Sequence, residues 1–222
     1  MENSKISWFE KILILSGTHL PSIRREVREM VRQYDLQNGG KPKKYTAYAV
    51  SSNLIKKSAY KTAGFGGLAA APGTVPWIGV IGTIIISTTV DIALLLREQI
   101  ELCYAISVAY DVNMDEDELK ATTLALLGFS GSAGAAKGIT SGVMRTVVDE
   151  VANKYLQRGL NKASVEVAEK LVPKLLGRLY RFIPLLGIPL SASINMASTM
   201  MVGNQARKYF STWYDDEEEE KI

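Results

Sequence analysis

The chain has little of the two residue types on which nucleophilic and metal-dependent catalysis most often rely. It contains one histidine, His19, and one cysteine, Cys103, among 222 residues. A single cysteine excludes an intramolecular disulfide and a cysteine metal cluster, and any histidine triad or histidine metal site would depend on His19 alone. His19 stands near Pro21 without a surrounding motif, so we predict that it lies in a surface turn. Cys103 lies in an apolar segment and is expected to be a small core residue.

Charge is missing from two long windows, although 22% of all residues are charged. The first window is the 29 residues 62–90, and the second is the 25 residues 182–206. The 20 residues 77–96 begin inside the first window and extend past its end. They are enough to cross a hydrocarbon core of about 30 Å. The windows are therefore buried in protein, in lipid, or in each at different times.

Three features of these windows argue against two membrane spans. Both windows carry several hydroxyl side chains, and each contains glycines and prolines. Basic residues precede both windows, so two spans would place these basic flanks on opposite sides of the membrane, against the positive-inside tendency. We predict a buried pair of helices. Partial insertion, with Phe65 or Trp77 at the membrane interface, is kept as an alternative.

A short pattern recurs at the two windows. Residues 76–80 and 184–188 both read Pro-apolar-apolar-Gly-apolar, and each precedes a long apolar segment. Proline ends the preceding helix, and glycine lets two backbones approach closely. Each long segment also carries a polar residue, Asp91 or Asn195, that we expect to be buried. The sequence thus predicts an all-α, compact multi-helix bundle around two long apolar helices, each preceded by a Pro-x-x-Gly segment.

Helical spacing dominates the remaining chain, and no convincing strand alternation is found. Asp115 and Glu118 have the spacing of a capping box at the start of a helix, and Arg97 and Glu101 can pair one turn apart. Helices are expected over roughly 6–15, 21–34, 45–64, 116–127, 143–159, 162–180 and 191–213. A further long helix is expected to begin near Pro76 or Thr83 and to run to about Asp111, and the helix over 162–180 is expected to be kinked or split at Pro173.

Charge is unevenly distributed along the chain. Residues 20–61 carry ten Lys/Arg against three Asp/Glu, whereas residues 215–220 are all acidic. A chain whose main part is basic is attracted to anionic surfaces. We expect contact with a membrane or lipid through these residues: Lys56, Lys57, Lys61, Phe65 and Trp77. Solvation of helix faces is the simpler alternative. Nucleic-acid binding is not predicted, because no recognised motif accompanies the basic residues.

Two stretches resemble ligand sites without matching their patterns. Residues 131–138 lack the second glycine and the Ser/Thr of a phosphate loop, and no strand precedes them. The acids from Asp111 to Glu118 lack the glycine and glutamate positions of an EF-hand, and favourable charge at a helix N-terminus explains them better. We predict no catalytic residue, no cofactor and no metal. An enzyme using Asp91 or these acids is the weaker alternative.

Several segments, in their order and spacing, resemble EcsC-family proteins. They are residues 57–68, 75–79, 91–110, 124–128, 183–187 and 206–210, with Asn195 and Gly203. The resemblance covers about residues 45–212. It implies an α-helical, bacterial, membrane-associated protein, and the family's name comes from a protein encoded beside an ABC transporter. No established catalytic residues come with the resemblance, so none are carried over.

These observations lead to one predicted organisation and two predicted functions. Residues 1–44 are expected to form N-terminal amphipathic helices, residues 45–212 the EcsC-like helical domain, and residues 213–222 an acidic disordered tail. We predict a non-enzymatic accessory protein, cytoplasmic and peripheral to the inner face of the membrane, that contacts anionic lipid or a membrane protein. The alternative is a soluble helical carrier that encloses an acyl-chain ligand. The sequence does not determine the oligomeric state.

Overall fold

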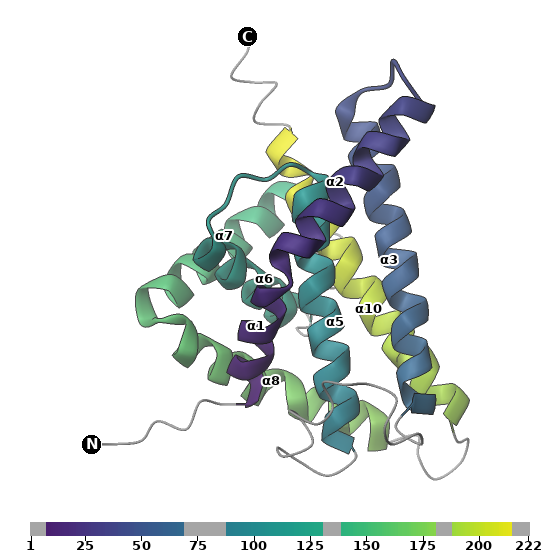
Figure 1. Ribbon diagram of the computed structural model, residues 1–222. Helices are drawn as coiled ribbons and strands as arrows, with labels where there is room; N and C mark the ends of the chain where they lie inside the picture. Colours follow the sequence, from purple (N-terminus) through teal and green to yellow (C-terminus); the bar gives the residue numbers. More distant parts are fainter. Residues whose placement is uncertain (1–7, 69–87, 131–138, 181–187, 215–222) are drawn as a thin grey trace.

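The regular structure of the described residues is entirely helical, which confirms the predicted all-α class for this part of the chain. The computed structural model describes residues 8–68, 88–130, 139–180 and 188–214, and no strand occurs within them. Figure 1 shows the arrangement of the helices. They are α1 (Trp8–Thr18), α2 (Leu20–Gln37), α3 (Lys43–Leu68), α5 (Thr88–Ala109), α6 (Glu116–Ser130), α7 (Ser141–Arg158), α8 (Leu160–Tyr180) and α10 (Ile188–Phe210).

Local sequence signals account for several of the helix ends. The Asp115 carboxylate accepts hydrogen bonds from the backbone N–H groups of Asp117 at 2.9 Å and Glu118 at 2.8 Å. The Glu118 carboxylate in turn accepts one from the Asp115 backbone N–H at 3.1 Å. This reciprocal pair is the predicted capping box, and it satisfies N–H groups that have no partner within the helix. Gly159 joins α7 to α8 with a φ of +87°, a conformation that favours glycine.

Helix α5 is the centre of the bundle. It contacts α1, α2, α3, α6 and α10, and Figure 1 shows it beside α1, with its upper part behind α2. Its fully buried side chains include Leu96, Ile100 and Ile106. Cys103 is also completely buried, as predicted for a small core residue, and burial raises the pKa of its thiol to about 12. Burial of these apolar side chains stabilises the fold.

Helices α3 and α10 lie side by side in opposite directions (Figure 1). Near one end of the pair the Thr62 hydroxyl is 3.0 Å from that of Thr199, and nearer the other end Ser52 bonds to Arg207. Gly203 lies between them, facing Ile55 on α3 and Leu102 on α5. The absence of a side chain at Gly203 therefore allows α10 to pack closely against two helices at once.

The remaining helices complete the core on the other sides of α5. Helices α6, α7 and α8 contact one another, and α8 continues through Pro173. Leu13 on α1 and Val27 on α2 belong to the same cluster of buried residues as the α5 side chains. The outer face of α2 carries the exposed arginines of the basic region, Arg24, Arg25, Arg28 and Arg32.

Parts of both charge-free windows lie outside the described residues. These parts include both Pro-x-x-Gly segments and Trp77, and the glycine-rich residues 131–138 lie outside as well. Phe65 and Asp91 belong to α3 and α5, but their side chains are not among those described. Within the described ranges, no helix combines the length and the apolar character needed to cross a bilayer.

Candidate functional site

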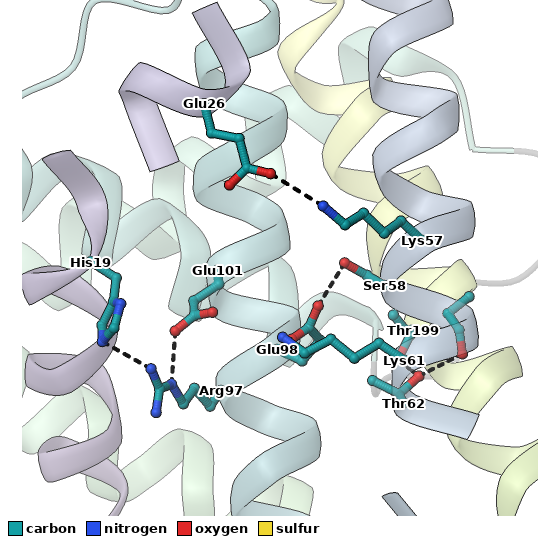
Figure 2. Close-up of polar contacts among 11 residues, drawn as sticks. His19, Glu26, Lys57, Ser58, Lys61, Thr62, Arg97, Glu98, Glu101 and Thr199 are labelled. Carbon is teal, nitrogen blue, oxygen red and sulfur yellow. Dashed lines mark hydrogen bonds and ion pairs between the residues drawn. The ribbon is translucent and has the colours of Figure 1, made fainter. Parts of the chain in front are cut away.

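The three lysines predicted to contact lipid lie on α3, and they differ in their partners. The Lys57 ammonium is 3.1 Å from a Glu26 carboxylate oxygen on α2, and the Lys61 ammonium pairs with Glu98 on α5 (Figure 2). Lys56 is exposed and forms no ion pair with any residue that the structure describes. Of the three charges, that of Lys56 is therefore the least neutralised.

Glu98 is a buried carboxylate held between two helices. Its side chain is 9% exposed, and it accepts a hydrogen bond of 2.8 Å from the Ser58 hydroxyl as well as pairing with Lys61. A buried charge needs such partners, because its transfer out of water is otherwise costly. Figure 2 shows these groups pointing toward one another from α3 and α5. Lys61 thus stabilises the contact between α3 and α5.

A second polar cluster lies deeper, between α3, α5 and α10. The Thr62 hydroxyl is 3.5 Å from the backbone carbonyl oxygen of Asn195, whose residue is 5% exposed. The Gln99 amide on α5 donates a hydrogen bond of 3.0 Å to the Ser198 hydroxyl on α10. These bonds, together with that between Thr62 and Thr199, satisfy polar groups inside the bundle and fix the register of the helices.

The single histidine lies at the surface, as predicted, and contacts a charged pair. His19 precedes α2, and its Nε2 atom is 3.0 Å from Nη2 of Arg97. Because a guanidinium group only donates, Nε2 of His19 accepts in this contact. Arg97 also donates to Glu101 at 2.7 Å, which confirms the predicted pair one turn apart. No group of metal-ligating side chains occurs among the described residues.

The outward face of α3 carries an aromatic stripe. Tyr45, Tyr48 and Tyr60 are 44%, 54% and 68% exposed, and Ser52 and Lys56 occupy the positions between them. The spacing of three or four residues places all five on one side of the helix. The Lys41 ammonium is 4.2 Å from the centre of the Tyr45 ring, and its hydrogen bond lowers the pKa of that phenol.

A hollow of about 460 Å³ lies between this stripe and α10. Its lining combines aromatic, thioether and cationic side chains and includes no acid. The lining residues are Tyr45, Tyr48, Ala49, Ser52, Ile55, Lys56, Met200, Asn204 and Arg207. Met200 is 38% exposed at its edge, and the neighbouring Met201 is 42% exposed. We call this hollow the α3–α10 groove.

Arg207 is fixed in the groove by neutral groups on several sides. Its Nη1 atom donates to the Ser52 hydroxyl at 2.7 Å, and its Nη2 atom donates to the Asn204 side-chain oxygen at 2.8 Å. The guanidinium carbon lies 4.4 Å from the centre of the Tyr48 ring, within the range of a cation–π contact. The arrangement holds a full positive charge in a defined position beside open space.

A second hollow, of about 250 Å³, has a different character. It lies where α6, α7 and the end of α10 meet, and its lining includes Glu118, Asp149 and Arg145. Asp149 pairs with Arg145 at 3.6 Å and accepts a hydrogen bond from Tyr209. Burial, and then the nearby carboxylate, raise the pKa of the Tyr209 phenol well above its usual range. The lining of this second hollow carries two acids and one base, whereas the lining of the α3–α10 groove has only positive charges.

The lysines predicted from the sequence to contact lipid lie on α3, but the sequence did not predict the groove. Lys56 lines the groove, whereas Lys57 and Lys61 pair with acids on neighbouring helices. Arg207 and Tyr48 were not singled out as a site. The spacing of the α3 tyrosines could have indicated an exposed face, but nothing in the sequence pairs that face with α10. No family model matches the chain, and no curated protein or solved structure is significantly similar to it.

Proposed function

We propose that this is a non-enzymatic helical accessory protein that acts at the cytoplasmic face of a bacterial membrane. In this proposal the face formed by α3 and α10 contacts anionic lipid, or a membrane protein beside it. The single observation that supports the proposal best is the α3–α10 groove, in which Lys56 and Arg207 lie among exposed tyrosines and a methionine without an acid. The resemblance to EcsC-family proteins is a second, independent support.

Physical chemistry explains why such a face suits a membrane surface. Tyrosine favours the membrane interface because one end of its ring is apolar and the other is polar. Cations near an anionic surface gain about 1 kcal/mol each at physiological salt. A face that combines both kinds of side chain binds weakly and reversibly, with its polar groups in the headgroup region. Phe65 and Trp77 remain predicted membrane-contact residues.

Two further features belong to the proposal. We propose that α5 and α10 are the two long apolar helices, each introduced by its Pro-x-x-Gly segment, and that the charge-free windows pack in the bundle. The contacts that α5 and α10 make with each other support this arrangement.

A soluble carrier that encloses an acyl chain remains the alternative function. Native mass spectrometry of the purified protein distinguishes it, since a carrier would retain a bound lipid.

Fractionation of cells tests the proposed location. We expect the protein to sediment with membranes and to be released by a wash with high salt or carbonate, because ionic contacts weaken as salt rises. A protein found only in the soluble fraction would contradict the membrane contact. A protein that resists both washes would contradict the peripheral mode of binding.

A further inference from the structure

Among the residues that the structure describes, the guanidinium of Arg207 differs from the half-buried Arg97 and Arg145 in having no carboxylate partner. Arg97 pairs with Glu101 at 2.7 Å, and Arg145 pairs with Asp149 at 3.6 Å. Arg207 instead bonds to the Ser52 hydroxyl and the Asn204 amide oxygen, and no described acid pairs with it. Because these partners are neutral, they do not compensate the positive charge of Arg207, which can therefore attract an anionic ligand.

The geometry of the arginine leaves donors available. A guanidinium carries five N–H donors, and the contacts with Ser52 and Asn204 use two of them. The remaining donors suit the oxygens of a phosphate, which the planar fork of arginine binds with two parallel hydrogen bonds. Stacking on Tyr48 further restricts the group, so little conformational freedom is lost when an anion binds.

A second cation and an apolar wall complete the groove. Lys56 lies one helical turn beyond Ser52 on α3, about 6 Å along the helix axis. Both cations therefore line the same hollow, which has a volume of about 460 Å³. Tyr45, Ile55 and Met200 supply apolar surface beside them. Two positive charges next to apolar walls suit a molecule with a doubly charged phosphate and a short hydrocarbon portion.

We propose that the α3–α10 groove binds the phosphomonoester headgroup of one anionic phospholipid. Arg207 binds the phosphate oxygens, Lys56 supplies the second charge, and the apolar walls contact the glycerol and the first part of the acyl chains. A phosphomonoester carries between about −1.5 and −2 charges at neutral pH, which the two cations balance. This inference rests on the proposed function, because it assumes that the α3–α10 face meets the membrane.

Vesicle binding at matched surface potential tests the inference. Vesicles containing phosphatidic acid, a phosphomonoester, are compared with vesicles containing phosphatidylglycerol, a phosphodiester, with mole fractions adjusted until their zeta potentials agree. The wild-type chain is expected to prefer phosphatidic acid by about tenfold, as one added charge-assisted contact would give. Equal binding to both would overturn the inference but not the proposed function. Failure to bind either anionic vesicle would overturn the inference and would also contradict the proposed contact with anionic lipid.

Variants locate the preference in the groove. Arg207→Lys keeps the charge but loses the planar fork, so we expect most of the preference for phosphatidic acid to disappear. Lys56→Gln, at an exposed position that does not threaten folding, should also reduce it. Lys154→Gln on α7 removes the same charge outside the groove and should leave the preference unchanged. A preference that survives both groove variants, or falls equally in Lys154→Gln, would overturn the inference.

A soluble ligand distinguishes the two sources of phosphate. In isothermal titration, short-chain phosphatidic acid below its micellar concentration is compared with glycerol 3-phosphate. We expect the lipid to bind at least about tenfold more tightly, because its acyl carbons contact the apolar walls. Equal affinities would assign the groove to a free phosphomonoester and would overturn the lipid inference.

Discussion

Gly203 on α10 packs so closely against Ile55 on α3 that a Cβ atom built on the glycine would lie 2.7 Å from the Ile55 Cγ1 atom. The same added atom would lie 3.0 Å from Leu102 on α5. Real Cβ atoms essentially never approach another atom as closely as 2.7 Å, so the Ile55 side chain or α10 itself would have to shift to accept a side chain at position 203. The contact explains how α3 and α10 can form one continuous face.

Gly203→Ala is therefore expected to lower the free energy of unfolding by about 1–3 kcal/mol, as overpacking of a core does. Urea denaturation measures this change. Gly64→Ala is the matched control, because a Cβ at this exposed helical position meets nothing within 4 Å. The control should be neutral or stabilising by up to about 1 kcal/mol, since alanine favours helix over glycine. Equal effects of the two substitutions would contradict the close packing.

The two paired lysines of α3 should differ in their contribution to stability. Lys61→Met leaves the buried Glu98 carboxylate without its cation, so we expect a loss of about 1–3 kcal/mol in the free energy of unfolding. Lys57→Met breaks a pair whose side chains are both more than 60% exposed, and should change stability by about 0.5 kcal/mol or less.

Adding Glu98→Gln to the Lys61→Met variant should restore part of the loss, because the uncompensated buried charge is then removed. Urea midpoints of the two single variants and of this double variant measure these effects. Similar midpoints for Lys61→Met and Lys57→Met would show that the exposed and the buried pairs are equivalent, which contradicts the burial of Glu98.

Several local features follow from the sequence because they depend on helix geometry alone. The capping box at Asp115 and the pair of Arg97 with Glu101 need only the spacing within one helix, and both are found as predicted. Burial of Cys103 follows from the apolar residues around it. In these cases, the partner that determines the interaction is a few residues away.

The groove depends instead on contacts between distant residues. Ser52 and Arg207 are 155 residues apart, and the bond between them forms only because α3 packs against α10. The spacing of Lys56, Lys57 and Lys61 shows that they share a region of α3, but not which of them faces an acid. Glu26 and Glu98 come from two other helices, so their partners depend on the packing of the bundle.

The burial of Cys103 predicts slow thiol chemistry and a loss of stability at high pH. Its thiol pKa is about 12 in the folded chain, against an ordinary value of 9.0. Between pH 9 and 12 the unfolded chain therefore releases this proton and the folded chain retains it. The contribution of this thiol to the free energy of unfolding is therefore fully present below pH 9. Above pH 9 it falls by up to about 1.4 kcal/mol per pH unit.

Comparison with Cys103→Ala isolates this contribution. Between pH 9 and 10 the wild-type free energy of unfolding should fall more steeply than that of the variant. A thiol-specific reagent should also modify the native protein far more slowly than the protein in urea. Labelling at the same rate in both conditions would contradict complete burial of the thiol.

The acidic residues at the end of the sequence should weaken binding to anionic surfaces. Residues 215–222 contain six acids and one lysine, so their removal raises the formal net charge from +3 to +8. A chain that ends at residue 214 is expected to bind anionic vesicles more tightly, with the largest gain at low salt, where charges interact over longer distances. Replacing the six acids with the corresponding amides should have the same effect. Unchanged binding in both variants would show that this segment does not oppose the basic face.

Partitioning of the wild-type chain onto vesicles tests the central claim most directly. The bound fraction is measured on neutral and anionic vesicles of equal size as the salt concentration rises, and again for a variant carrying Lys56→Gln and Arg207→Gln. We predict stronger binding to anionic vesicles, loss of that binding as salt increases, and a clear reduction in the variant. Equal binding to neutral and anionic vesicles, or no change in the variant, would contradict the claim that the α3–α10 face contacts anionic lipid.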